Sequence, residues 1–112
     1  FGATLAYHMD KLHLTNEALA GRSLINEDTI RKYRNGSNKS KPNIQTVVAL
    51  CVGLQLPLPF SLDLVHKSGH TFAGEPSDIA YLTILSTMTG SSIYDCNALL
   101  RSTGVPPLAK EK

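Results

Sequence analysis

The densest cluster of charge in this sequence is a run of basic side chains between residues 31 and 41. It holds five cations and no carboxylate: Arg31, Lys32, Arg34, Lys39 and Lys41. Basic side chains at this density can contact successive phosphates of a nucleic acid through salt-sensitive electrostatic attraction. The same run can equally be a solvated basic loop. Charge alone leaves both interpretations open.

Histidines and cysteines are the residues that could bind a metal or act as nucleophiles. His66 and His70 are four residues apart, with Asp63 one turn earlier, but a glycine between the histidines should end the helix before the second one. No HExxH motif is present, and Cys51 and Cys96 fall on apolar helix faces, which predicts buried thiols. The sequence also lacks a GxSxG motif and a glycine-rich phosphate loop. We therefore expect no metal, no cofactor and no enzymatic activity.

Composition restricts the class of protein. The chain has 112 residues, of which 42% are hydrophobic and 18% charged, so it holds one domain or one small domain with an appendage. Residues 1–41 hold seven cations against four anions, whereas residues 42–112 hold four against five. No apolar stretch is long enough for a membrane span, and no signal peptide is present, which predicts a cytoplasmic protein. The chain begins with Phe1 rather than Met, which points to a fragment of a longer protein.

Polar residues that flank the apolar segments predict where helices begin and end. Thr, Ser and Asn cap helix N-termini, and Gly ends helices because it adopts left-handed backbone without steric cost. Leu5, Met9 and Leu12 recur at helical spacing and predict a first helix around them. The later helices are predicted over 17–22 (capped by Thr15), 26–34 (capped by Asn26, ended by Asn35-Gly36), 44–55 (capped by Asn43), 61–67, 78–88 (preceded by Ser77) and 93–103. Strand patterns are weak, so the predicted fold class is all-α.

Two short helices, a tight turn and a basic loop form the arrangement of a helix-turn-helix. The segment from Leu14 to Gly36 is LTNEALAGRSLINEDTIRKYRNG. It resembles the phage-repressor and Cro-like (XRE) family, whose pattern runs LT-x-x-x-LA, a turn, T/S-I and x-NG. The resemblance continues through Lys41-Pro42 and the apolar helix around Thr46, and covers about 65 of the 112 residues.

This resemblance implies a bacterial transcriptional regulator, repressor-like, that places helix 26–34 in the major groove of double-stranded DNA. The residues implied to face the bases are Asn16, Glu27, Asp28, Arg31 and Lys32. The residues implied to contact DNA phosphates are Arg34, Asn35, Ser37, Asn38, Lys39 and Lys41. Such regulators bind two-part sites as homodimers, with recognition helices roughly 34 Å apart.

Two features depart from the family pattern. Leu24 stands where the turn usually has glycine, so either the turn is irregular or its left-handed residue lies elsewhere. Glu27 and Asp28 would face phosphates, which disfavours binding unless Arg31, Lys32 or a cytosine pairs with them.

The rest of the chain resembles the C-terminal extension of some Firmicutes helix-turn-helix proteins. LVHKSGH at 64–70 and IYDCNALL at 93–100, followed by Gly104 and Pro106-Pro107, carry that likeness. We expect a five-helix, lambda-repressor-like core over residues 1–69 and two helices within 70–112, which cap the core or form a dimer surface. The alternative function is a protein-interaction or regulatory module of a larger protein, with little affinity for DNA.

Overall fold

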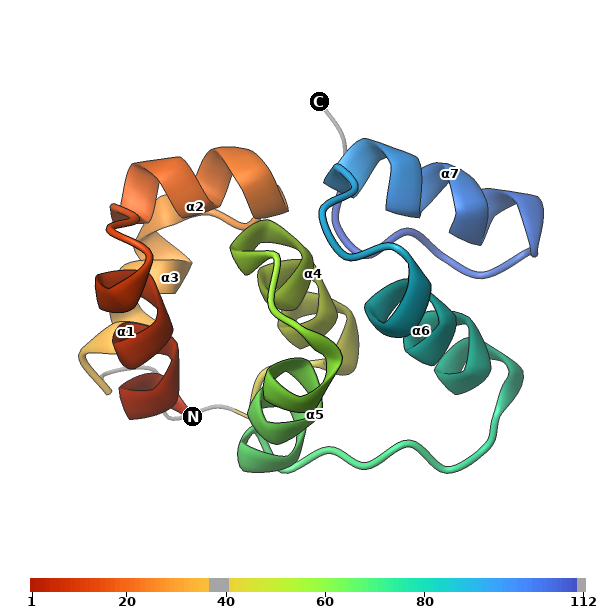
Figure 1. The fold of residues 1–112 in the computed structure, drawn as a ribbon, viewed down its shortest axis with the longest axis horizontal. Helices are drawn as coiled ribbons and strands as arrows, with labels where there is room; N and C mark the ends of the chain where they lie inside the picture. The colour runs from red at the N-terminus through yellow and green to blue at the C-terminus, as the bar shows by residue number, and fades with distance from the viewer. Residues whose placement is uncertain (37–40, 111–112) are drawn as a thin grey trace.

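The regular structure of this protein is entirely helical in the residues that the computed structural model describes, 1–36 and 41–110. Its seven helices are α1 (Gly2–Lys11), α2 (Asn16–Ser23), α3 (Glu27–Arg34), α4 (Ile44–Leu54), α5 (Leu58–Lys67), α6 (Pro76–Thr87) and α7 (Ile93–Ser102). Figure 1 shows α1, α2 and α3 at one end, α6 and α7 at the other, and α4 between them. The predicted all-α class is confirmed.

Side-chain caps fix where α2 and α3 begin. The Thr15 hydroxyl accepts a hydrogen bond from the Ala18 N–H at 3.1 Å, and the Asn26 side-chain oxygen accepts one from the Asp28 N–H at 2.8 Å. Each bond satisfies a backbone donor that has no partner within its helix. The next residue after the C-cap of α3 is Gly36, whose φ of 75° turns the chain away. These predicted boundaries are confirmed.

Two helices begin earlier than the sequence predicted, and proline is the reason in both. Helix α5 begins at Leu58 rather than at residue 61, because Pro57 is its N-cap and Pro59 lies in its first turn. Helix α6 begins at Pro76, so Ser77 lies inside it and does not precede it. A proline in the first helical turn removes an N–H that would have no partner there anyway.

Helix α4 is the centre of the hydrophobic core. Every residue from Val47 to Leu54 is buried, because α2 and α5 pack against this helix, as do α6 and α7. Asn43 is the N-cap residue of α4, as predicted. The Asn43 side-chain oxygen accepts a hydrogen bond from the Thr46 hydroxyl at 2.7 Å, however, and not from a backbone N–H. One apolar cluster extends from Leu5 to Leu108, so residues beyond 69 share the core of those before it.

Candidate nucleic-acid interface

The turn between α2 and α3 is built on a left-handed leucine. Leu24 has φ 61° and ψ 14°, and its N–H donates to the Ala20 carbonyl oxygen at 2.9 Å. The buried Ser23 hydroxyl donates to the Leu19 carbonyl at 2.7 Å and accepts from the Ile25 N–H at 3.2 Å. Left-handed backbone costs a leucine about 1–2 kcal/mol, which these bonds and the half-buried Leu24 side chain offset. The left-handed residue therefore lies at Leu24 itself, where the pattern usually has glycine, so the alternative that it lies elsewhere is wrong.

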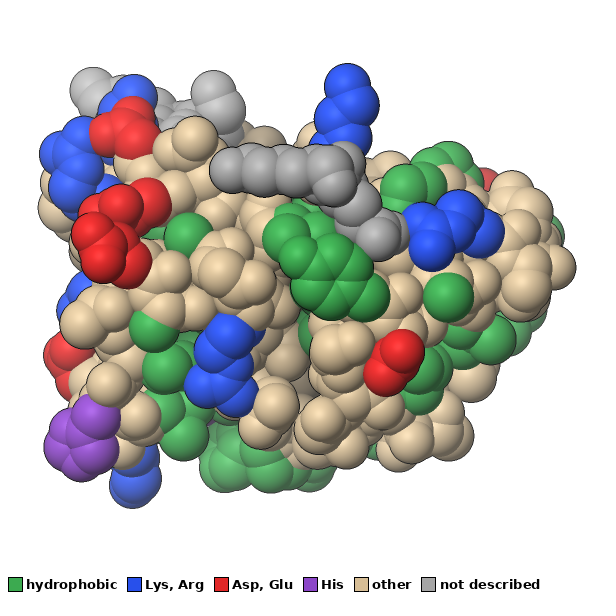
Figure 2. Space-filling model, turned by 90° about the horizontal axis from the view of Figure 1, so that it is seen from above, with side chains coloured by type: hydrophobic (Ala, Val, Ile, Leu, Met, Phe, Trp, Pro, Cys, Tyr) green, Lys and Arg blue, Asp and Glu red, His purple; other side chains and the backbone are tan. Residues whose placement is uncertain are grey.

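Helix α3 has one buried face and one charged face. Ile30 is fully buried, and the buried Tyr33 ring packs edge to face with the Phe1 ring, with 5.4 Å between the two ring centroids. The exposed side chains of the helix are Glu27, Asp28, Arg31 and Lys32. Figure 2 shows acidic and basic side chains next to one another at the end of the molecule that α1, α2 and α3 form. The predicted inward and outward positions of α3 are confirmed.

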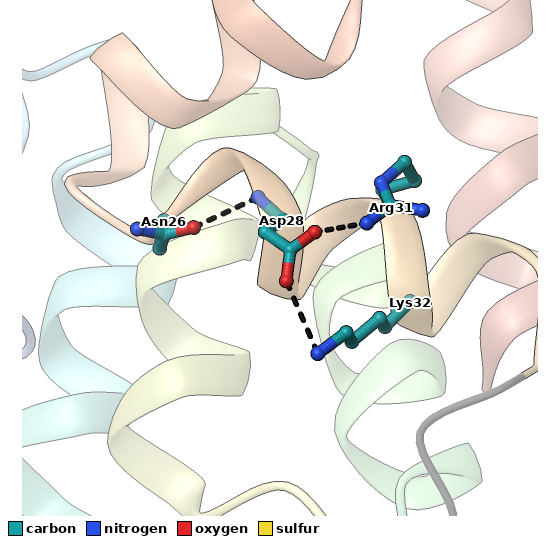
Figure 3. A network of polar contacts seen from close by, with 4 residues as sticks. All are labelled: Asn26, Asp28, Arg31 and Lys32. Carbon is teal, nitrogen blue, oxygen red and sulfur yellow. Dashed lines mark hydrogen bonds and ion pairs between the residues drawn. The ribbon is translucent and has the colours of Figure 1, made fainter.

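The Asp28 carboxylate pairs with both exposed cations of α3, as Figure 3 shows. One carboxylate oxygen pairs with the Arg31 guanidinium, and the other lies 3.1 Å from the Lys32 Nζ. Hydrogen bonds from Arg31 and Lys32 hold the pKa of the Asp28 carboxyl below its ordinary value. Glu27 forms no salt bridge among the residues that the structure describes. One of the two acids that departed from the family pattern is thus paired within its own helix.

Arg34 connects the end of α3 to two other helices. Its guanidinium donates to the Asn16 side-chain oxygen at 2.9 Å and pairs with the Asp10 carboxylate at 3.0 Å. The Arg34 side chain is only 27% exposed. The sequence suggested that Asn16 faces a base and Arg34 a phosphate, yet the two side chains bind each other. Asp10 was not recognised from the sequence, because it lies 24 residues from Arg34 and no local pattern connects them.

The other predicted phosphate contacts lie beyond the end of α3. Asn35 is the exposed C-cap of that helix. Lys41 is exposed, and its alkyl chain passes close to Gly69, where a Cβ would lie 3.1 Å from the lysine Cε. His70 Nε2 lies 2.5 Å from the Pro42 carbonyl oxygen and ties this segment to the end of α5. Ser37, Asn38 and Lys39 are outside the described residues.

A groove of about 780 Å³ runs between the helix-turn-helix and the C-terminal extension. It is lined by Ala20, Gly21, Leu24, Ile25, Asn26, Glu27, Asp28, Arg31, Tyr94 and Lys110. Tyr94, from α7, is half-exposed. The sequence did not reveal that α7 and the segment after it contribute side chains beside α3, since no local pattern reports how two helices pack at long range.

The cysteines lie in the core. Burial raises the pKa of the Cys51 thiol to about 12 and that of Cys96 to about 11. Since the thiolate is the reactive form, both residues are inert at neutral pH. Within residues 1–36 and 41–110, no group of three or more His, Cys, Asp or Glu side chains is arranged to hold a metal ion.

None of the helices in the described part of the chain is long and apolar enough to cross a membrane. Comparisons of the chain with protein-family models, with curated proteins and with solved structures gave no match.

Proposed function

We propose that this protein binds double-stranded DNA in a sequence-specific manner, as a repressor-like transcriptional regulator, with α3 in the major groove. The observation that carries the proposal is the division of α3 into a buried face, with Ile30 and Tyr33, and a fully charged exposed face. The B-DNA major groove is about 12 Å wide and admits one helix. In helix-turn-helix proteins, the recognition helix is the second of two helices that a tight turn joins. Here α3 takes that position after α2. The resemblance of residues 14–36 to the XRE family supports the same function.

The Arg34 contacts support docking of this unit as a rigid body. By joining Asp10 and Asn16 to the end of α3, they fix α1, α2 and α3 relative to one another. Base reading would then fall to Arg31, Lys32 and the acids beside them, because arginine and lysine donate to guanine and a carboxylate accepts from cytosine N4. Lys41 and Asn35 would contact the backbone, which positions the protein without reading sequence.

The test is selection from random-sequence duplexes with the purified chain at two salt concentrations. We expect an enriched motif, and a two-part motif would indicate that a homodimer binds it. Lys32→Ala should weaken binding to that motif and reduce the slope of log affinity against log salt by about one. Lys67→Ala is the matched control, because Lys67 pairs with Asp63 on α5 at 3.0 Å in the same i,i+4 geometry. Equal losses in the two variants, or no enriched motif, would contradict the proposal.

The second candidate function is a protein-interaction module with little DNA affinity. It is favoured by the pairing of Arg31 and Lys32 with Asp28, which leaves α3 with no large excess of free positive charge. This function predicts that the selection enriches nothing and that any duplex binding is weak and disappears steeply with salt. The partner would then be a protein or another part of a longer chain.

A further inference from the structure

One carboxylate engages the two outward cations of α3. Asp28 uses one oxygen for Arg31 and the other for Lys32, and all three side chains are half-exposed. The Asn26 cap fixes the Asp28 backbone at the start of the helix, so the carboxylate is held beside both cations (Figure 3). The three groups are in reach of DNA, but they carry a net charge of +1 in place of the +2 of the cations alone.

This arrangement penalises contacts that depend on phosphates only. A phosphate that approaches Arg31 or Lys32 also approaches the Asp28 carboxylate, since the carboxylate lies 3.1 Å from the Lys32 Nζ. The phosphate must compete with that carboxylate for the cations and leaves it without a partner next to another anion. Non-specific binding is almost entirely phosphate attraction, so it bears this penalty in full.

A G·C base pair can remove the same penalty. In the major groove, guanine presents the O6 and N7 acceptors that suit arginine, and cytosine presents an N4 amino donor that suits a carboxylate. Arg31 and Asp28 can therefore break their mutual ion pair, and Arg31 can bind the guanine while Asp28 binds the cytosine of the same base pair. Neither charge is then left unpaired. This matters because a charged group near the DNA surface is costly when desolvated without a partner.

We propose that Asp28 is a specificity-determining residue: it withholds Arg31 and Lys32 from arbitrary DNA and releases them at a site that presents a G·C pair to α3. The inference rests on the proposed DNA-binding function. Asp28 acts by excluding wrong sites as well as by recognising the right one.

The experiment compares Asp28→Asn with the unmodified chain in duplex selection and in equilibrium binding to two duplexes, the selected site and a scrambled duplex of equal composition. At low salt, Asp28→Asn should bind the scrambled duplex about three- to tenfold more tightly, the range expected when an exposed ion pair and one repulsive charge are removed. The ratio of affinities for the two duplexes should fall by at least as much, and the G·C preference should weaken. Asp28→Glu, which keeps the carboxylate, should retain the original ratio.

Two control variants separate this effect from a change in net charge. Glu75→Gln removes an exposed carboxylate at the N-cap of α6 that forms no salt bridge among the described residues, and Asp63→Asn frees Lys67 on α5 from the same kind of i,i+4 pair. Both should leave the ratio of affinities within about twofold of the original. Asp28→Ser repeats the loss of charge with a different side chain, and circular dichroism checks that every variant is folded.

The outcomes distinguish the inference from the function on which it rests. If the unmodified chain selects no motif, the DNA-binding proposal fails and the role of Asp28 fails with it. If the chain selects a motif that Asp28→Asn selects equally well, with an unchanged ratio of affinities, only the inference is overturned. It is also overturned if Glu75→Gln or Asp63→Asn lowers the ratio as much as Asp28→Asn does, because general charge would then explain the result.

Discussion

Arg34 links three helices through one guanidinium group. It contacts Asp10 from α1 and Asn16 from α2, and most of its side chain is buried. Charge-assisted hydrogen bonds of this kind stabilise more than exposed ion pairs do. Arg34→Ala should therefore lower the free energy of unfolding in urea by about 1–2 kcal/mol. Arg22→Ala, at an exposed position of α2, should change it by less than about 0.5 kcal/mol.

His8 is buried beside two aromatic rings, with centroids 5.3 Å from Tyr7 and 5.6 Å from Phe60. Burial lowers the pKa of His8 from the ordinary value of 6.5. The charged groups that face it are Asp63, which opposes this shift, and Lys67 and Lys11, which add to it. The folded protein therefore holds His8 in its neutral form more strongly than the unfolded chain does.

The sign of the resulting pH dependence follows from proton binding. As pH falls through the unfolded value of 6.5, the unfolded chain takes up the proton first, so protonation favours unfolding. Stability should therefore decrease on acidification and level off below the folded pKa of His8. Urea unfolding between about pH 7.5 and about pH 5 measures this loss. His8→Gln should flatten the curve, whereas the exposed His66→Gln should not, and an equal slope in His8→Gln would assign the effect to another group.

Local signals in the sequence identified the charged face of α3 and the candidate partners of Asp28, but not the contacts of Arg34. Glu27 and Lys32 could be placed outward because helical spacing and the buried Ile30 decide that from nearby residues. The Asp28 pairs are also local, at three and four residues, so both cations could be named as candidate partners from the sequence. The Arg34 contact with Asp10 could not be predicted, because it exists only after α1 has packed against α3.

At the scale of helices, α2 and α4 approach closely at one glycine. A Cβ on Gly53 of α4 would lie 2.9 Å from Leu19 Cδ1 and 3.3 Å from the Ser23 backbone nitrogen. The Ser23 nitrogen is part of the backbone, so it cannot move unless α2 shifts with it. Gly53→Ala should therefore destabilise the fold by about 1–3 kcal/mol, even though alanine is the better helix former.

Gly21, on α2, provides the matched control for that substitution. A Cβ there would meet nothing within 4 Å, so Gly21→Ala should stabilise the protein by about 0.5–1 kcal/mol through helix propensity alone. Thermal unfolding of the two variants measures the contrast. If both alanines raised the melting temperature, the packing of α2 on α4 would have to be looser than the structure has it.

Helix boundaries were predictable wherever the capping side chain is itself the signal. Thr15 and Asn26 both cap as expected, because a cap depends on residues only two or three positions away. Proline is ambiguous by contrast, since it is compatible with a loop and with the first helical turn. Pro59 lies in the first turn of α5, which packs on α4, and no local pattern reports that packing.

At the scale of the molecule, the C-terminal extension and the helix-turn-helix share one apolar cluster through α4. Ile84 of α6 is 1% exposed and lies beside Cys51 and Leu56 in a narrow gap between the two parts. The sequence allowed α6 and α7 either to cap the core or to form a dimer surface, and the packing of both on α4 places them over the core. A shared core predicts that residues 1–69 and 70–110 unfold together.

Ile84→Ala tests this coupling, because the lost side chain belongs to the extension and the effect can be read in the other part. Removing a fully buried isoleucine costs about 2–4 kcal/mol, a large share of the roughly 5–15 kcal/mol that a domain of this size has. Hydrogen exchange measured by mass spectrometry should therefore speed up in the amides of α2 and α4 as well as α6. Ile79→Ala on the same helix, where the side chain is 57% exposed, should leave exchange nearly unchanged. Faster exchange confined to α6 and α7 would mean that the extension unfolds by itself, and that the remaining helices hold the charged face of α3 in place without it.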